Sequence, residues 1–214
     1  MWLIAAQLLK KLKTSSPGTI HHETRGWSLK RLFDFALALL LTLILAAPLL
    51  MVALMVRLTS AGPILYWSDR VGRNNKIFSM PKFRSMRIGT PEVATHLLAN
   101  PGAHLTPIGP LLRKSSLDEL PQLWSILTGD MSFVGPRPAL FNQQDLIDLR
   151  TQKNVHQLMP GLTGWAQING RDELPIPEKV ALDAVYLEKQ SFWFDIKILW
   201  LTALKVVLGH GVVH

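Results

Sequence analysis

Two adjacent carboxylates, Asp118 and Glu119, stand in the stretch richest in residues that could do chemistry, residues 111–138. Neighbouring residues at the start of a helix point about 100° apart. One carboxylate could therefore hold a divalent cation while the other attacks a phosphorus atom. A second interpretation needs no catalysis, because Ser116 and Glu119 have the spacing of a helix capping box. The spacing alone leaves both interpretations open.

Cations flank these carboxylates in the sequence. Arg113 and Lys114 precede them, Arg137 follows between two prolines, and Lys82 and Arg84 come earlier in the chain. A site that transfers a phosphoryl group needs positive charge and hydrogen-bond donors around its anionic substrate. The two prolines hold Arg137 on a stiff backbone, which limits the entropy lost when it binds an anion. Without that context, Arg137 is equally well a surface cation in a turn.

A glycine-rich stretch, residues 160–171, carries the amide side chains of Gln167 and Asn169. Such a loop can bring backbone N–H groups and amides to a nucleotide or a sugar. It has the spacing of neither a P-loop nor a dinucleotide-binding fingerprint, so a turn-rich loop without a ligand is the simpler interpretation. The seven histidines show no spacing typical of metal ligands.

The composition favours an anionic partner at a membrane. The 214 residues carry a net charge of +8, while 48% of them are hydrophobic. A basic chain attracts phospholipids, nucleotides or nucleic acid. Nucleic-acid binding is disfavoured, because the chain is so apolar and lacks a basic and aromatic platform. The absence of cysteine excludes disulfides, thiolate metal sites and thiol catalysis.

Residues 35–56 form an uncharged apolar segment, long enough for the roughly 20 residues that span a bilayer as a helix. Pro48 should kink this helix, and both flanks are basic, which favours the cytoplasmic side for each. We therefore expect a re-entrant helix that enters and leaves on one face. A buried helix of a soluble core and a cleaved signal peptide fit the length and position of the segment less well.

The expected organisation has three parts. Residues 1–28 are a basic preface, with a short amphipathic helix or a frayed terminus at 2–13 and a linker at 15–18. Residues 29–57 are the re-entrant membrane helix. Residues 58–214 are a cytoplasmic catalytic domain that ends in an apolar, tryptophan-containing segment, 191–209. That last segment is expected to be an interfacial helix, with packing on the soluble domain as the alternative.

Local patterns predict an α+β fold that is mostly helical. Short strands are expected at 64–67 and 76–78. Helices are expected at 139–158, ended by Pro160 and Gly161, and at 177–190, which has proline at its start.

Four blocks in the chain resemble the bacterial sugar transferase family of monotopic phosphoglycosyl transferases. They read KRLFDFALALLL (30–41), GPILYWSDRVGRNNKIFSMPKFRSMR (62–87), LLRKSSLDELPQLWSILTGDMSFVGPRP (111–138) and PGLTGWAQINGR (160–171). The resemblance implies a bacterial enzyme of the cytoplasmic (inner) membrane with its catalytic domain on the cytoplasmic face. A UDP-sugar would donate its sugar 1-phosphate to polyprenyl (undecaprenyl) phosphate and release UMP, which initiates glycan synthesis.

The resemblance also implies roles for particular residues. Asp118 would be the nucleophile that forms a covalent phosphoglycosyl intermediate, and Glu119 would bind Mg²⁺. The positions that match family motifs near the phosphates or nucleotide are Lys82, Arg84, Arg113, Pro136, Arg137 and Pro138. Gln167 and Asn169 match a loop that contacts substrate. The resemblance leaves open which sugar is transferred and whether the protein forms a homodimer.

One position departs from the family pattern. Small members often carry Ser-Pro at the break of the membrane helix, where a hydroxyl can satisfy a freed carbonyl group, whereas this chain has Ala47 and Pro48. The kink is expected to survive on proline alone. The larger relatives carry additional N-terminal spans, so this chain is expected to be the minimal form. The alternative to an enzyme is a non-catalytic membrane adaptor with a basic, lipid-binding face.

Overall fold

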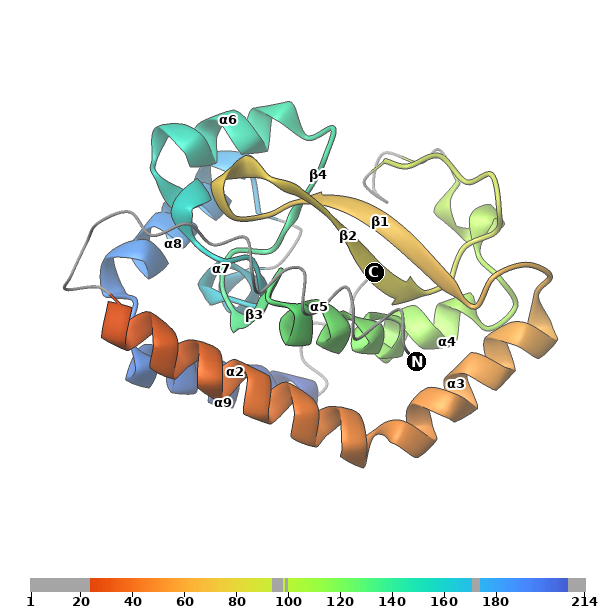
Figure 1. Cartoon of the computed structure of the whole chain (residues 1–214). Coiled ribbons are helices and arrows are strands. Elements are labelled where there is room, and N and C mark those ends of the chain that lie inside the picture. The colour runs from red at the N-terminus through yellow and green to blue at the C-terminus, as the bar shows by residue number, and fades with distance from the viewer. Residues whose placement is uncertain (1–23, 94–97, 99, 171–173, 208–214) are drawn as a thin grey trace.

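The computed structural model describes residues 24–93, 98, 100–170 and 174–207 (Figure 1). The helix expected at 2–13 and the linker expected at 15–18 lie outside these residues. The described chain is a mostly helical α+β protein, which confirms the expected fold class.

Two apolar helices, α2 (Thr24–Ile44) and α3 (Ala46–Thr59), form a bent pair along one side of the molecule (Figure 1). Their axes turn by 64°. Pro48 has no N–H to donate to the carbonyl oxygen of Ile44, so the helical hydrogen-bond ladder is interrupted at the bend. In the described chain, no single helix is long and apolar enough to cross a membrane, but this bent pair together meets that test by length and composition. The pair therefore has the form expected of a re-entrant hairpin.

The two faces of the bent pair differ sharply. On one face, Ala38, Val52 and Val56 are buried in the protein core. The opposite face carries large apolar side chains that are more than a third exposed: Leu32, Leu39, Leu40, Leu43, Ile44, Leu50, Met51, Leu54 and Leu58. Exposed apolar surface of this extent is typical of a protein that contacts lipid or another partner.

A polar network fixes α2 to the rest of the protein. The Lys30 ammonium group donates to a carboxylate oxygen of Asp195, to the Tyr186 hydroxyl (3.2 Å) and to the backbone carbonyl of Val134 (3.1 Å). The Tyr186 hydroxyl in turn donates to the other oxygen of Asp195 at 2.7 Å. Because Val134 lies just before the Pro136–Arg137–Pro138 turn, this network ties the apolar helix to the segment that carries Arg137.

A three-stranded antiparallel sheet covers the other side of the molecule (Figure 1). Its strands are β2 (Ile77–Phe83), β1 (Leu65–Val71) and β4 (Ala139–Leu140), in that order. The strands expected at 64–67 and 76–78 are thus parts of one longer hairpin, closed by a 3₁₀ turn, η1 (Arg73–Asn75). A separate parallel pair joins β3 (Ser132–Val134) to β5 (Gly161–Thr163).

Short helices lie between the sheet and the bent pair. They follow one another as α4 (Gly109–Lys114), the 3₁₀ helix η4 (Leu117–Gln122) and α5 (Leu123–Thr128). Strand β2 packs against η4, and α5 packs against α2. The main core lies at this junction and includes Leu123, Ile126, Met131 and Phe133. A further 3₁₀ turn, η3 (Pro101–His104), precedes α4.

The prediction of a single helix at 139–158 is wrong. The segment begins with β4, whose Ala139 and Leu140 pair with β1, so its start is extended. The helix α6 covers only Gln144–Gln152, and a 3₁₀ turn, η5 (Val155–Gln157), follows it. Asn154 separates the two in the left-handed region (φ 59°), which a continuous helix cannot contain.

The C-terminal elements largely follow the prediction. After α7 (Trp165–Asn169), helix α8 (Ile176–Lys189) confirms the helix expected at 177–190. The last helix, α9 (Phe192–Val207), contacts α2 through the ion pair of Lys30 with Asp195 and the ring contact of Phe33 with Phe192 (Figure 1). Its buried face contains Ile198 (0% exposed), whereas Trp193 and Trp200 are 77% and 66% exposed. The helix thus packs on the domain with one face, and the other face keeps the amphipathic character that an interfacial helix needs.

Candidate active site

Asp118 and Glu119 lie in η4, and the capping box proposed as their alternative role is not formed. Ser116 adopts the left-handed conformation (φ 57°) and its side chain makes no capping hydrogen bond. The backbone N–H of Glu119 donates to the backbone carbonyl of Ser116 instead, at 3.1 Å. Glu119 therefore takes no part in a cap, and both carboxylates are largely covered by the protein: Asp118 is buried and the Glu119 side chain is 19% exposed.

Glu119 is held by two cations from different parts of the fold. Its Oε1 atom accepts from the Lys82 ammonium group at 2.8 Å and from Arg137 Nη2 at 2.9 Å. Burial would raise the pKa of Glu119, but Arg137 and Lys82 outweigh that effect and hold the pKa well below its usual range. Burial also lowers the pKa of Lys82, and Glu119 counteracts this only in part. Glu119 is thus a fixed anion between β2 and the turn that follows β3.

Asp118 is only 9% exposed. Burial raises its pKa to about 6, and Lys82 is the strongest influence in the opposite direction. Glu119 raises the pKa further, whereas Arg113 and Arg137 lower it. The structure thus brings together five of the residues singled out in the sequence: the two carboxylates and these three cations. A desolvated carboxylate among cations is a reactive group that can approach an anionic substrate.

The Pro136–Arg137–Pro138 turn is positioned by close backbone contacts between two glycine-containing segments. The N–H of Gly135 donates to the carbonyl oxygen of Thr163, and the N–H of Gly161 donates to that of Pro136, both at 2.9 Å. A Cβ atom on Gly135 would lie 2.2 Å from the carbonyl oxygen of Met159. Only glycine permits this approach, which holds the turn beside β5.

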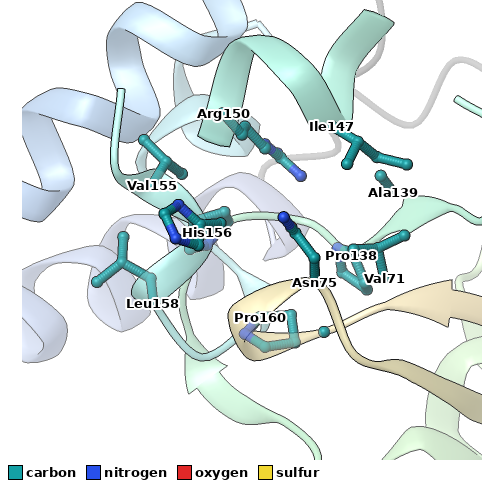
Figure 2. A pocket seen from close by; sticks show the side chains of 12 residues that line it. Val71, Asn75, Pro138, Ala139, Ile147, Arg150, Val155, His156, Leu158 and Pro160 are labelled. Atoms are coloured by element: carbon teal, nitrogen blue, oxygen red, sulfur yellow. The ribbon is translucent and has the colours of Figure 1, made fainter. Parts of the chain in front are cut away.

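Two residues that sequence reasoning missed support this turn from behind. Arg150 in α6 donates through Nη1 to the backbone carbonyl of Arg137 at 2.8 Å. Asp183 in α8 accepts from Nε and Nη2 of the same guanidinium group at 3.0 and 2.7 Å. Figure 2 shows Arg150 reaching from α6 into a small cavity of about 30 Å³ behind the turn, which Pro138 and His156 also line. No motif or spacing in the sequence links residues 137, 150 and 183.

The two amides of the glycine-rich loop differ in their surroundings. Both polar atoms of the Gln167 side chain are buried and have no partner among the described residues. They lie close to Gly164, where an added Cβ would be 2.5 Å from Gln167 Oε1. Because Gly164 packs on Gly135, Gln167 lies next to the segment that carries Arg137. Asn169 is exposed and donates to the carbonyl oxygen of Trp165 at 2.7 Å, which closes the end of α7.

Arg84 is not brought to the carboxylates in this structure. Its Nη2 atom donates to the backbone carbonyl and the hydroxyl group of Ser60, each at 2.8 Å, at the end of α3. These are its only hydrogen bonds to described residues, although the side chain is only 5% exposed. Arg84 follows the last residue of β2, and its hydrogen bonds to Ser60 hold its side chain at the end of α3 and not beside Lys82.

The carboxylates of this site are of the kind that binds Mg²⁺, the metal ion that the sequence resemblance implies. The described residues contain no group of three or more histidine, cysteine, aspartate or glutamate side chains that could hold a metal ion. Mg²⁺, however, is often bound by one or two carboxylates together with water and substrate phosphates. Asp118 and Glu119 offer such carboxylates, and the Oε2 atom of Glu119 makes no hydrogen bond to the described residues.

Comparison with known proteins places the chain in a family. A family model described as "Bacterial sugar transferase" matches residues 25–209. The chain is 41% identical over 186 residues to the uncharacterized sugar transferase EpsL of Bacillus subtilis (strain 168), with 86% of this chain and 90% of that protein covered.

The names of two longer relatives state a function. The undecaprenyl-phosphate glucose phosphotransferase of Komagataeibacter xylinus is 42% identical, with 85% of this chain and 36% of that protein covered. The UDP-glucose:undecaprenyl-phosphate glucose-1-phosphate transferase of Escherichia coli (strain K12) is also 42% identical, with 83% and 40% covered. The chain thus spans 36 to 40% of these two relatives. On the extent of the family match, the chain belongs to the bacterial sugar transferase family.

Proposed function

We propose that this protein transfers a sugar 1-phosphate from a nucleoside diphosphate sugar to polyprenyl phosphate at the cytoplasmic face of a bacterial membrane. UDP-sugars are the expected donors, because the Escherichia coli relative is named for UDP-glucose, and both longer relatives are named for undecaprenyl phosphate. The bent apolar pair and the exposed tryptophans of α9 support a site at a membrane surface, where a lipid phosphate is accessible.

The first half of the proposed reaction uses Asp118 as the nucleophile. A carboxylate oxygen of Asp118 attacks the β-phosphorus of the donor, and the bond between that phosphorus and the bridging oxygen to the α-phosphate breaks. UMP leaves with the bonding electrons, and the sugar phosphate stays on Asp118 as an acyl phosphate. Arg113 and Arg137 are near enough to lower the pKa of Asp118, so they can also stabilise the charge on the phosphoryl oxygens.

The second half regenerates the carboxylate. A phosphate oxygen of polyprenyl phosphate attacks the phosphorus, the bond to Asp118 breaks, and a polyprenyl diphosphate sugar forms. A carboxylate is the leaving group, so the ionised form of Asp118 is restored for the next cycle. Burial excludes water from Asp118, which disfavours hydrolysis of the intermediate before the lipid arrives.

Glu119 has a separate role in this proposal. Because Lys82 and Arg137 hold it as an anion, it stays charged while Asp118 reacts. Glu119 would hold Mg²⁺, which neutralises diphosphate charge when it is bound. Lys82 and Arg137 would contact the same phosphates, and the buried amide of Gln167 is a further candidate for substrate contact.

A single arrangement carries the proposal: a buried carboxylate with a raised pKa beside a second carboxylate held by Lys82 and Arg137. The test uses purified protein in detergent with Mg²⁺, polyprenyl phosphate and a panel of UDP-sugars, and it measures UMP release. At least one donor is expected to release UMP, and that donor identifies the sugar. No release across a broad panel would favour the non-catalytic adaptor.

Mutation of Asp118 tests the covalent step. Asp118→Asn is expected to abolish both turnover and the trapping of a sugar phosphate on the protein by mass spectrometry. The matched control is Asp148→Asn, an exposed position on α6. Robust turnover by Asp118→Asn would remove Asp118 as the nucleophile and leave the family assignment untouched.

A further inference from the structure

A second cationic region lies at the end of the bent pair, away from the Asp118 and Glu119 carboxylates. A cavity of about 290 Å³ opens where α3 leads into β1. Its described lining residues include two arginines, three hydroxyl side chains and no acidic residue: Thr59, Ser60, Ala61, Arg84, Arg87, Ile88, Thr106 and Pro107. The cavity far exceeds the 10–15 Å³ or so that admits one water molecule.

Arg84 is the unusual residue of this cavity. It is 5% exposed, and Ser60 satisfies only its Nη2 atom. The Nε and Nη1 atoms are buried and have no partner among the described residues. Buried polar groups are nearly always paired, and a charged group costs more than a neutral one when it is not. The guanidinium therefore has more hydrogen-bonding capacity than the fold uses.

Arg87 supplies an accessible charge on the same cavity. Its Nε atom donates to the backbone carbonyl of Leu105 at 3.2 Å, and its other two nitrogens have no partner among the described residues. Arginine binds phosphate through two parallel hydrogen bonds, so Arg87 can bind an anion with its two Nη atoms. Two arginines beside one cavity are thus arranged for an anion with several acceptor oxygens.

The apolar surroundings indicate what carries that anion. Leu58, in the last turn of α3, is 75% exposed, and Ile88 on the cavity wall is 72% exposed. The apolar outer face of α3 leads directly to the cavity. A soluble anion would gain nothing from these side chains, whereas a lipid can lay its chain along them and place its phosphate between the arginines.

We propose that the Arg84 and Arg87 cavity binds the phosphate group of a membrane lipid. The ligand is a phosphate ester with an apolar tail, either polyprenyl phosphate or an anionic phospholipid. In the first case the cavity is a docking position of the lipid substrate, from which its phosphate must still move to Asp118, and this case rests on the proposed function. In the second it anchors the protein at the end of the bent pair.

Arg87→Gln tests the proposal without disturbing the contact between Arg84 and Ser60 at the end of α3, because Arg87 is exposed and takes no part in that contact. The matched control is Arg73→Gln in the turn at the other end of the hairpin. Arg73 is also exposed, and its Nε atom also donates to a backbone carbonyl, that of Gln157 at 2.9 Å. Each variant loses one positive charge, and the thermal midpoint of each in detergent confirms folding.

Native mass spectrometry of detergent-released protein measures lipid binding independently of catalysis. The probes are polyprenyl phosphate, uncharged polyprenol and phosphatidylglycerol, each added alone. The amount of at least one of the two phosphate lipids retained by Arg87→Gln is expected to be at least about fivefold lower than in the wild type and in Arg73→Gln. The reason is the loss of a charge-assisted contact. Polyprenol retention should be equal in all three proteins.

The identity of the weakened lipid distinguishes the two sources. Loss of polyprenyl phosphate assigns the cavity to the substrate, and loss of phosphatidylglycerol alone assigns it to a phospholipid. Equal retention of both phosphate lipids by Arg87→Gln and Arg73→Gln would overturn the proposal. Failure of the proposed reaction would instead appear as absent UMP release, which this binding measurement does not use.

Discussion

Arg150 donates through Nη1 to the backbone carbonyl of Arg137 at 2.8 Å, although the two residues belong to different elements. Arg150 is itself held by Asp183, and the two side chains are 9% and 2% exposed. Arg137 then donates to Glu119 at 2.9 Å. A buried ion pair between α6 and α8 therefore sets where the backbone of Arg137 lies. Arg150 and Asp183 touch no reacting group, so they act as positioning residues.

Asp183→Asn is expected to lower both stability and turnover. Asparagine keeps the shape of the side chain but leaves the buried Arg150 charge without its partner, which typically costs about 3–5 kcal/mol. The freed guanidinium should also release the carbonyl group of Arg137. The measurements are the thermal midpoint in detergent and the steady-state rate of UMP release. Glu178→Gln, at an exposed position on the same helix, should leave both unchanged.

A double variant separates positioning from stability. Arg150→Met with Asp183→Leu removes both buried charges at once, and such replacements are often neutral or stabilising. This variant should recover most of the stability that Asp183→Asn loses. Its kcat should stay below that of the wild type, because the carbonyl of Arg137 still lacks its donor. Full activity in a folded double variant would show that the ion pair is only structural.

Glu119→Gln is expected to weaken the response to Mg²⁺ and to slow the reaction by about 100-fold or more. The substitution removes the negative charge that Lys82 and Arg137 share, so both cations lose their common anchor. Without that anion, the pKa of Lys82 should fall further below its usual value, because Glu119 is the main influence that raises it. The measurement is the rate of UMP release across a Mg²⁺ titration.

Glu188→Gln, an exposed carboxylate on α8, is the matched control for that titration. It should give the wild-type Mg²⁺ response. An unchanged half-saturating Mg²⁺ concentration in Glu119→Gln would place the metal ligand elsewhere.

The sequence predicted the members of the site better than their arrangement. The carboxylates and Arg137 lie in dense local blocks, where spacing and stiff prolines carry most of the information. Arg84 carries the same positive charge as Lys82 and lies two residues away, yet it bonds to Ser60. The path of the chain after α3 brings Ser60 to Arg84, and no local sequence pattern predicts that path.

The wrong helix at 139–158 has a similar cause. Local helix propensity favoured one element, but pairing of Ala139 with Val71 across the sheet, and the left-handed Asn154, divided the segment. The Arg150 contact to Arg137 depends on that division, because α6 must begin after β4 to lie over the turn. The position of Arg150 was therefore missed with the boundaries of its helix, whereas Asp183 lies on α8, whose bounds were predicted, and only the tertiary contact to Arg150 reveals its role.

The pH dependence of adduct formation should report the pKa of Asp118. Only the ionised carboxylate can attack, and burial raises its pKa to about 6. The rate of the first UMP burst should therefore fall about tenfold between pH 7 and pH 5, since each unit below the pKa costs a factor of ten in the ionised form. Arg137→Gln should move this limb to higher pH, because Arg137 lowers the pKa. A burst rate that is constant down to pH 5 would contradict the assignment.

Asp118→Asn should stabilise the protein while it removes activity. The folded pKa of Asp118 is about 6, above its ordinary value of 3.8, so folding favours the protonated form. The contribution of Asp118 to the free energy of unfolding is therefore fully present below about pH 4, and it is lost as the pH rises through 6. At pH 7.5 the buried charge costs up to about 3 kcal/mol, which asparagine removes. The thermal midpoint in detergent should rise by several degrees at pH 7.5 and by much less at pH 4.5, and a fall at pH 7.5 would oppose this account.

The bent pair makes a prediction about topology that labelling can test. The chain has no cysteine, so single cysteines at Arg25→Cys and Thr59→Cys can be labelled without background. A re-entrant hairpin places both on the cytoplasmic face, and both should react with an impermeant maleimide only in inverted vesicles. Lys153→Cys, at an exposed position after α6, reports the side that carries the catalytic domain, which the proposed function places in the cytoplasm. Pro48→Ala restores an N–H to the carbonyl oxygen of Ile44 and should straighten the pair, which moves part of the Thr59→Cys population to the opposite side. Labelling of Arg25→Cys and Thr59→Cys from opposite sides in the protein that retains Pro48 would show a simple transmembrane span.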